Sequence, residues 1–179
     1  MYPHRAFMLI LLFTAAILAA DTKLKIYTLP DEAKPALKEM LHRIDTAKYR
    51  IDAAIYSFTH KTIAKRLANA ARRGVKIRVI FDRESNIRNR RSRIGYLSKF
   101  RNIDTYLLSG KARRRGDGEG LMHMKLMIID RRYLIFGSAN WTYSAFGLNH
   151  EVLAFAEDYR KAAGMERSFE RMLSKAKPY

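Results

Sequence analysis

The chain has 179 residues, 48% of them hydrophobic, which suits one domain with a proper core and leaves no room for two copies of a unit of about 150 residues. Its formal net charge of +18 and isoelectric point near 10.3 point to a polyanionic partner, either nucleic acid or an anionic membrane surface. Cysteine is absent, which excludes disulfides and thiolate chemistry but says little about the compartment.

Residues 1–20 have the pattern of an export signal. Arg5 lies near the start, an uncharged apolar segment follows over residues 6–18, and two alanines precede the expected cleavage point. Leu18, three positions before that point, is larger than signal peptidase usually prefers. An uncleaved membrane anchor is therefore the alternative, although about 15 apolar residues is short for a membrane span. We expect export to the periplasm or cell envelope, with residues 21–179 forming a single domain.

Strands and helices are predicted to alternate through the first half of the chain. The predicted strands cover residues 24–29, 49–58 and 75–81. The predicted helices cover residues 31–47 and 59–74, where apolar side chains recur at helical spacing. The strand–helix–strand order over residues 49–81 is typical of a βαβ unit, which favours a parallel pair of strands.

Residues 83–115 interrupt this order with a concentration of positive charge, eleven lysines and arginines against two acids. A helix is predicted over residues 87–100, a strand over residues 103–108, and a Gly-rich basic loop over residues 109–121. A solvated loop is the simpler interpretation. Like charges at this density repel one another, however, and persist most easily where something negative binds. We therefore predict phosphate-binding walls of a groove. The predicted residues are Arg88, Arg90, Arg91, Arg93, Lys111, Arg113, Arg114 and Arg115.

The stretch HMKLMIIDRRYLIFGSAN over residues 123–140 is the most informative part of the chain. Two apolar runs, residues 126–129 and 133–136, flank a short polar segment that begins at Asp130. This pattern predicts a β-hairpin of two largely buried strands joined by a tight turn.

Polar groups of the hairpin are expected to converge at one end of it. His123 and Lys125 alternate by two, so both side chains leave the same face near the start of the first strand. The second strand ends in Gly137, Ser138 and Asn140, small or polar residues that let backbone and hydroxyl approach a ligand closely. A lone histidine at a strand end is more often structural, but six specified residues at fixed spacing rarely match by accident. These groups together predict an anion-binding site.

After the hairpin, a short helix or loop is predicted over residues 141–149 and a strand over residues 151–156. Asp158 is expected to cap a terminal helix. The inner face of that helix is predicted from its spacing to be Ala162, Met165, Phe169, Met172 and Leu173. Strands alternating with helices predict an α/β fold, with a mixed β-sheet sandwiched between helices on both faces.

The hairpin has the spacing H-x-K-x4-D-x6-G-S-x-N, carried by His123, Lys125, Asp130, Gly137, Ser138 and Asn140. This pattern resembles the HKD signature of the phospholipase D superfamily and matches it at every position. The resemblance continues to Glu151, where the family has a glutamate that orients the catalytic histidine. The resemblance covers the chain from about residue 23 to the C-terminus. Within the superfamily, the chain resembles the small bacterial phospholipase D-like endonucleases, which carry one motif per chain. It implies a phospholipase D-like fold and a hydrolase of phosphodiester bonds.

The chemistry expected at this site begins with an imidazole nucleophile. Neutral His123 avoids the repulsion that an anion meets at a phosphodiester, and its attack gives a covalent phosphohistidine that water later resolves. Lys125, Ser138 and Asn140 can hold and neutralise the phosphoryl oxygens. The leaving group needs a proton from a second group. Because family members bring two motifs together, the resemblance implies a two-fold homodimer with one site at the seam, where the partner's imidazole acts as general acid.

The remaining motif residues have supporting roles in this interpretation. By resemblance, Glu151 hydrogen-bonds the far nitrogen of His123 and fixes its tautomer. Asp130 lies about five residues from Lys125, roughly 17 Å at strand rise, so a turn or a structural or interface hydrogen bond is expected of it. No H-x-H or H-E-x-x-H pattern is present, and no cofactor or metal is expected.

Three functions remain open. The first is an exported endonuclease acting on DNA, with RNA as a second candidate; the basic charge and the lack of a lipid-sized apolar insertion favour it. The second is a phospholipid hydrolase at a membrane surface, which an uncleaved N-terminal anchor would favour. The third is a non-catalytic nucleic-acid-binding protein, against which the intact His-Lys-Ser-Asn-Glu set argues.

Overall fold

The structure, a computed structural model, describes residues 22–112 and 116–179. The expected export signal over residues 1–20 and the arginines Arg113, Arg114 and Arg115 lie outside the described residues. Among the helices that the structure describes, none is long and apolar enough to cross a membrane.

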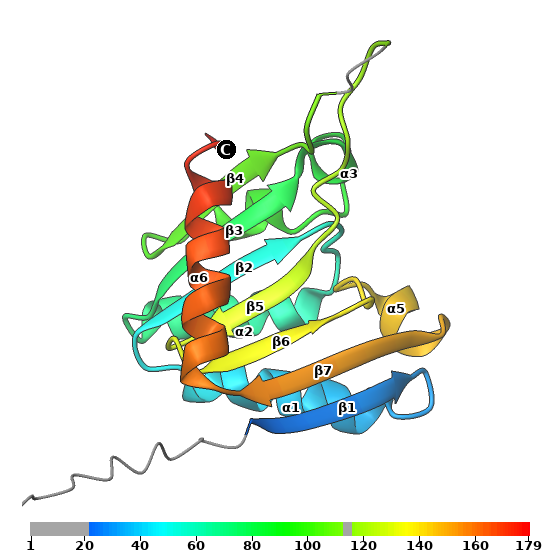
Figure 1. Cartoon of the computed structure of the whole chain (residues 1–179), viewed down its shortest axis with the longest axis vertical. Helices are drawn as coiled ribbons and strands as arrows, with labels where there is room; N and C mark the ends of the chain where they lie inside the picture. Colours follow the sequence, from blue (N-terminus) through cyan, green and yellow to red (C-terminus); the bar gives the residue numbers. More distant parts are fainter. Residues whose placement is uncertain (1–21, 113–115) are drawn as a thin grey trace, which may run out of the picture.

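An eight-stranded mixed sheet forms the centre of the molecule (Figure 1), with the strand order β1-β7-β6-β5-β2-β3-β4-β8. The strands are β1 Lys23–Leu29, β2 Arg50–Ile55, β3 Lys76–Asp82, β4 Ile103–Leu108, β5 Lys125–Ile129, β6 Tyr133–Gly137, β7 Glu151–Glu157 and β8 Lys177–Pro178. Strands β2, β3 and β4 run parallel, and the other neighbours pair antiparallel. The parallel pairing of β2 with β3 confirms the predicted βαβ unit.

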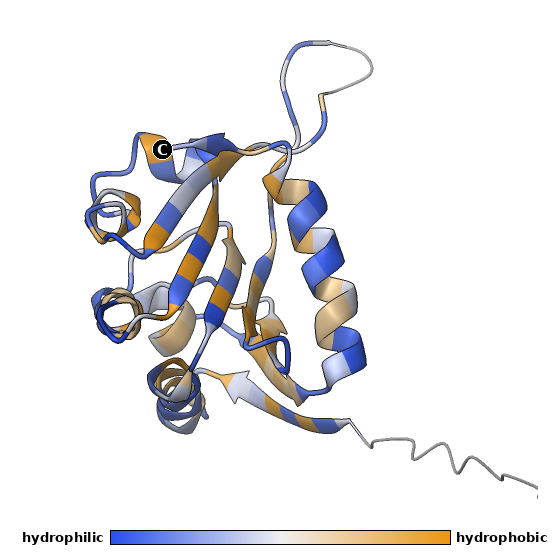
Figure 2. Cartoon of the chain, turned by 90° about the vertical axis from the view of Figure 1, so that its left-hand side faces the viewer, coloured by the Kyte–Doolittle hydropathy of each residue, from blue (hydrophilic) through white to orange (hydrophobic). Residues whose placement is uncertain are grey.

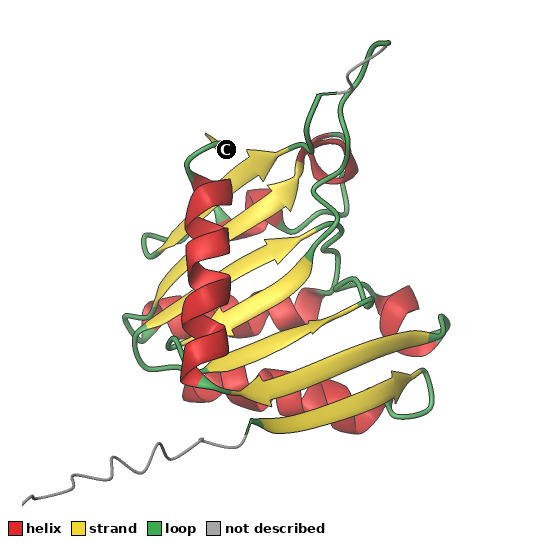
Figure 3. Cartoon of the chain, in the orientation of Figure 1, coloured by secondary structure: helices red, strands yellow, loops and turns green. Residues whose placement is uncertain are grey.

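Helices cover both faces of this sheet, which confirms the predicted α/β sandwich (Figures 2 and 3). The helices are α1 Ala33–Thr46, α2 Lys61–Arg72, α3 Arg83–Ile87, α4 Ile94–Leu97, α5 Tyr143–Gly147 and α6 Tyr159–Leu173. Of the described helices, α6 crosses one face, and α1, α2 and α4 lie on the other. The apolar residues divide accordingly into a large cluster on the α1–α2 side and a smaller one under α6.

The helix predicted over residues 87–100 is wrong in its extent. Two short helices, α3 and α4, occupy the region instead, and a turn-rich segment separates them. Polar side chains in this segment bond to nearby backbone groups: Asn86 donates to the carbonyl of Asp82, and Asn89 accepts from the amide of Arg91. Such local bonds compete with the helical ladder, which explains why one helix does not continue through the region.

The predicted hairpin is confirmed as β5 and β6. Asp130 and Arg131 take φ angles of 52° and 55°, the left-handed conformation found at both central residues of a type I′ turn. The amide of Arg132 donates to the carbonyl of Ile129 at 3.0 Å, and the strand pairing resumes at Tyr133. The Asp130 carboxylate accepts hydrogen bonds from the amides of Lys48, Tyr49 and Arg50 at 2.8, 2.8 and 2.9 Å. It thereby ties the turn to the start of β2, which agrees with the structural role expected for it.

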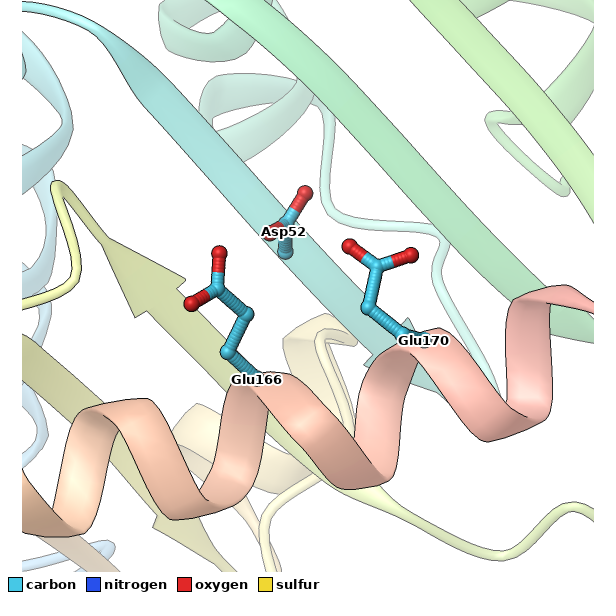
Figure 4. A group of neighbouring side chains, drawn as sticks. All are labelled: Asp52, Glu166 and Glu170. Atoms are coloured by element: carbon cyan, nitrogen blue, oxygen red, sulfur yellow. The ribbon is translucent and has the colours of Figure 1, made fainter.

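Three carboxylates lie close together between β2 and α6 (Figure 4). Asp52, only 2% exposed on β2, faces Glu166 and Glu170 on α6. Oxygen atoms of the three lie within 4.8 Å of one another, a spacing that would suit one metal ion.

Three arginines neutralise this cluster of Asp52, Glu166 and Glu170. Arg78 donates to Asp52 at 2.7 and 2.9 Å and to Glu170 at 2.7 Å. Arg50 and Arg131 pair with Glu166. The cluster is therefore an ion-pair network that fastens α6 to the sheet, and Arg78 is its centre.

The bond between Arg78 and Glu170 predicts an acid-sensitive stability. Hydrogen bonds from Arg78 lower the pKa of Glu170 below its ordinary value of 4.5. Because the folded pKa lies below the unfolded one, the stabilisation is complete above the unfolded value and is lost as the pH falls through the folded value. Glu170→Gln should lower the free energy of unfolding at neutral pH by less than about 1 kcal/mol, because the side chain of Glu170 is 47% exposed and solvent screens its charge. It should also flatten the dependence of stability on pH below about 4.5.

Urea unfolding between about pH 3 and pH 7, followed by circular dichroism, measures this effect. Glu84→Gln removes an exposed acid on α3 for which no described ion pair exists, and it should leave the pH dependence unchanged. Superimposable curves for the wild type and Glu170→Gln would contradict the prediction.

Candidate active site

The polar residues at the open end of the hairpin lie together where β5 begins and β6 ends. Trp141, 1% exposed, follows β6 and packs edge-on against Phe58 with the ring centres 5.0 Å apart. Its amide donates to the carbonyl of Ser57, and its carbonyl accepts from the amides of Thr59 and His60. These contacts hold the segment after β6 beside the end of β2, which fixes one wall of the site.

His123 and Lys125 lie together, as their spacing predicts. The Lys125 ammonium is 3.1 and 3.0 Å from the two ring nitrogens of His123 and donates to the carbonyl of His123 at 3.0 Å. His123 is exposed and Lys125 is buried. Burial lowers the pKa of Lys125, and the negative charge of Glu151 opposes this shift. The site thus offers an accessible imidazole beside a partly desolvated cation.

Tyr56, which the sequence reasoning missed, forms an aromatic wall against both groups. Its ring centre lies 4.5 Å from that of His123, at an interplanar angle of 62°, and 5.1 Å from the Lys125 ammonium. Its amide also donates to the carbonyl of Met124 at 2.9 Å. Tyr56 follows β2 directly, so only the pairing of β2 with β5 brings it here.

Ser138 and Glu151 form a hydrogen-bonded pair. The Ser138 hydroxyl donates to Glu151 at 2.5 Å and accepts from the amide of Val152 at 3.0 Å. Glu151 also accepts from the side chain of Asn149 at 3.2 Å. Asn140 accepts from the amide of Ser57 at 3.2 Å through its side-chain oxygen.

The expected hydrogen bond between Glu151 and His123 does not occur among the described residues. Strand β6 lies between β5 and β7, so the starts of those two strands are about 10 Å apart at the usual strand spacing. Glu151 therefore bonds to Ser138, at the end of the strand next to it, and acts on Lys125 through its charge.

Gly137 is required by the packing of β6 against β7. Its φ angle is 155°, and a Cβ atom there would lie 2.1 Å from the carbonyl oxygen of Val152. Any larger residue would push β7 away and separate Ser138 from Glu151.

The basic segment between α3 and α4 lies beside this edge of the sheet. Asn86 donates to the carbonyl of Tyr56 at 2.8 Å, and the amide of Arg93 donates to the carbonyl of Phe58 at 2.9 Å. The segment therefore runs alongside the site. The predicted cations described as exposed are Arg88, Arg90, Arg91 and Lys111. Arg93 is half-buried, and its guanidinium donates to the carbonyl of Arg91.

Asp82 is a second residue that the sequence reasoning missed. It is 1% exposed, and its carboxylate accepts from the amide of Ser85 at 2.9 Å and from the amide of Met122 at 3.0 Å. The first bond caps α3, and the second fixes the residue that precedes His123. An acid between an apolar strand and a helix is a recognisable cap signal, but its second partner lies forty residues away.

Replacing Asp82 should displace His123 more than it unfolds the protein. In Asp82→Asn the amide can still accept from Ser85 but presents a donor to Met122. We expect the free energy of unfolding to fall by about 1–3 kcal/mol. For the phosphodiester hydrolase that the HKD resemblance implies, we expect the kcat for bis(p-nitrophenyl) phosphate to fall about tenfold with KM nearly unchanged, because positioning errors affect the transition state most.

The matched control for this experiment is Asp104→Asn, which changes an exposed acid on the neighbouring strand β4. It should leave both quantities unchanged. A loss of stability in Asp82→Asn without any loss of kcat would mean that the carboxylate only supports the fold.

The chain matches the protein family described as "Cardiolipin synthase, PLD-like domain" over residues 40–173. Among curated proteins it is 30% identical to the mitochondrial cardiolipin hydrolase of Homo sapiens over 143 residues, which cover 80% of this chain and 53% of the human protein. The chain thus spans about half the length of that relative.

Two solved structures have a similar fold. NucT from Helicobacter pylori superimposes with a TM-score of 0.87 and 36% identity, covering 89% of this chain and 100% of that chain. Nuc from Salmonella typhimurium, a phospholipase D family member, has a TM-score of 0.75 and 24% identity over 89% and 99% of the two chains, which supports the fold alone. The chain therefore belongs to the phospholipase D superfamily, which includes hydrolases acting on phosphodiester bonds.

Proposed function

We propose that this protein is a metal-independent endonuclease that hydrolyses DNA, with RNA as the second candidate substrate, through a covalent phosphohistidine. The observation that carries the proposal is the exposed imidazole of His123 held 3.0 Å from the buried Lys125 ammonium. The net charge of +18 favours a polyanionic substrate over a single lipid headgroup.

The reaction begins when a ring nitrogen of His123 attacks phosphorus and the bond to the leaving oxygen breaks. Lys125 neutralises the charge that builds on the phosphoryl oxygens. Because the side-chain oxygen of Asn140 accepts from Ser57, its amide nitrogen is left to donate to the same oxygens. The leaving oxygen takes a proton from a second imidazole, which then activates the water that cleaves the phosphorus–nitrogen bond.

The proposal predicts activity that depends on one histidine and survives EDTA. Labelled single-stranded DNA and plasmid are incubated with the full chain in excess EDTA. His123→Ala should reduce cleavage by about 10³-fold or more, because it removes the nucleophile. His42→Ala, which truncates an exposed histidine on α1, should cleave like the wild type. Cleavage that EDTA abolishes would show that the phosphohistidine mechanism is wrong.

The second imidazole comes, in this proposal, from His123 of a second copy that packs on the α6 face. Strands β1, β7 and β6 align Ile26, Ala154 and Phe136 across that face beyond the helix. Ile26 is 55% and Phe136 40% exposed, so two large apolar side chains face solvent on either side of the small Ala154.

An apolar hollow of about 690 Å³ runs from this surface to the site. Leu24, Phe136 and Met165 line it together with His123 and Lys125. A copy that covers the hollow would therefore bring its own histidine to the catalytic edge, as a two-fold interface requires.

Ile26→Glu should weaken the proposed homodimer, because it places a charge in the apolar surface. Sedimentation velocity should show monomers, and cleavage should fall in proportion and recover as the protein concentration is raised. Tyr49→Glu is the control, since Tyr49 is 74% exposed and precedes β2, at the end of that strand away from the site. A fully active monomer of Ile26→Glu would contradict the proposal that two copies share one active site.

Hydrolysis of a phospholipid is the second candidate, favoured by the apolar hollow beside His123 and by the likeness to a cardiolipin hydrolase. Vesicles containing cardiolipin, assayed with the same variants, distinguish the two substrates. An export signal over residues 1–20 would place either enzyme in the periplasm or cell envelope, or tether it to the membrane if it is not cleaved.

A further inference from the structure

A second hollow on the α6 face has a different chemistry. It has a volume of about 850 Å³ and lies between the C-terminal half of α6, the end of β4 and the segment that leads to His123. Leu107, Met122 and Met172 are apolar residues of its lining. Its basic residues are Arg83, Lys111, Arg171, Lys175 and Lys177. Glu119 is the acid among its described lining residues. We call this hollow the basic groove.

The cationic side chains of the basic groove do not form the ion pairs that stabilise the described part of the fold. Within the described residues, none of the five forms an ion pair, and Arg171 donates only to the Ser168 hydroxyl. On the same helix, Glu166 and Glu170 are both paired with arginines. Cations near a helix C-terminus also stabilise its dipole, which accounts for Arg171 but not for Arg83 or Lys111.

Backbone hydrogen bonds fix the positions of two of these residues, Lys177 and Lys111. Lys177 belongs to β8 and pairs with Leu107 of β4, so the end of the chain lies on the sheet. On the opposite wall, the amide of Gly110 donates to the carbonyl of Gly120 at 2.7 Å, and that of Gly120 donates to the carbonyl of Lys111 at 2.9 Å. A Cβ atom on Gly110 would lie 2.4 Å from the Gly120 backbone, so the two halves of this loop are in close contact.

We propose that the basic groove binds the sugar-phosphate backbone of the strand being cut, on one side of the scissile bond. The groove contains His123 in its lining, so a strand lying in it reaches the nucleophile without a break. Five separate cations exceed the charge of one lipid headgroup but match successive phosphates, while the apolar residues can contact the bases. The inference rests on the proposed nuclease function and names residues that bind its substrate.

The test removes three charges from the basic groove and three from the opposite face. The groove variant is Arg171→Gln/Lys175→Gln/Lys177→Gln. The control variant is Lys34→Gln/Lys38→Gln/Lys65→Gln, on exposed positions of α1 and α2. Both are made in the full chain with His123→Ala, and anisotropy of a fluorescein-labelled single-stranded DNA is measured in EDTA at several salt concentrations. The groove variant should bind at least tenfold more weakly, with a salt slope smaller by about 2, and the control less than threefold more weakly.

Hydrolysis of bis(p-nitrophenyl) phosphate by the same triple variants with His123 intact separates binding from chemistry, because this small diester needs no groove. The groove variant should retain wild-type turnover of it. Equal losses of DNA binding in both triple variants, or loss of small-diester turnover in the groove variant, would overturn the inference. So would an intact affinity for DNA combined with lost binding to cardiolipin vesicles. If the wild type and the groove variant cleave DNA equally well, the inference is wrong but the proposed function stands. If the wild type neither binds nor cleaves DNA, the proposed function is wrong as well.

Discussion

The position of His123 depends on two hydrogen bonds to the peptide groups on either side of it. The buried carboxylate of Asp82 accepts from the amide of Met122, and the amide of Tyr56 donates to the carbonyl of Met124. Both partners stand where a core strand ends, β3 in one case and β2 in the other, so the rigidity of the sheet is passed to the histidine. An exposed imidazole held in this way is accessible and still has a defined place, although it precedes β5 rather than belonging to it.

Much of the fold follows from local patterns, whereas the site depends on contacts that no local pattern contains. Two apolar runs on either side of a short polar segment were sufficient to predict the hairpin, and Asp158 accepts from the amides of Arg160 and Lys161 as a helix cap should. The roles of Asp82 and Tyr56 depend on which strands become neighbours, and strand order is not written in periodicity. The same cause explains Glu151: its partner is Ser138 because β6 lies between β7 and β5.

The distribution of acids explains why the net charge of +18 is effective outside the molecule. Asp52 and Glu166 are occupied by arginines, and Asp82 and Asp130 by backbone amides. Because these acids are bonded within the fold, they are not close partners of the cations on the surface, and the net charge of +18 gives a positive field outside the molecule. Binding of a polyanion should therefore weaken with rising ionic strength.

The turn at Asp130 has a consequence for the opposite end of the hairpin. Successive side chains in a strand point to opposite faces, so a slip of β5 by one residue against β2 would turn Lys125 away from the site. Three amide bonds to Asp130 at one end, and the bonds to Met122 and Met124 at the other, make any such slip break contacts at both ends at once. An aspartate remote from His123 thus determines which face of the sheet carries the side chain of Lys125.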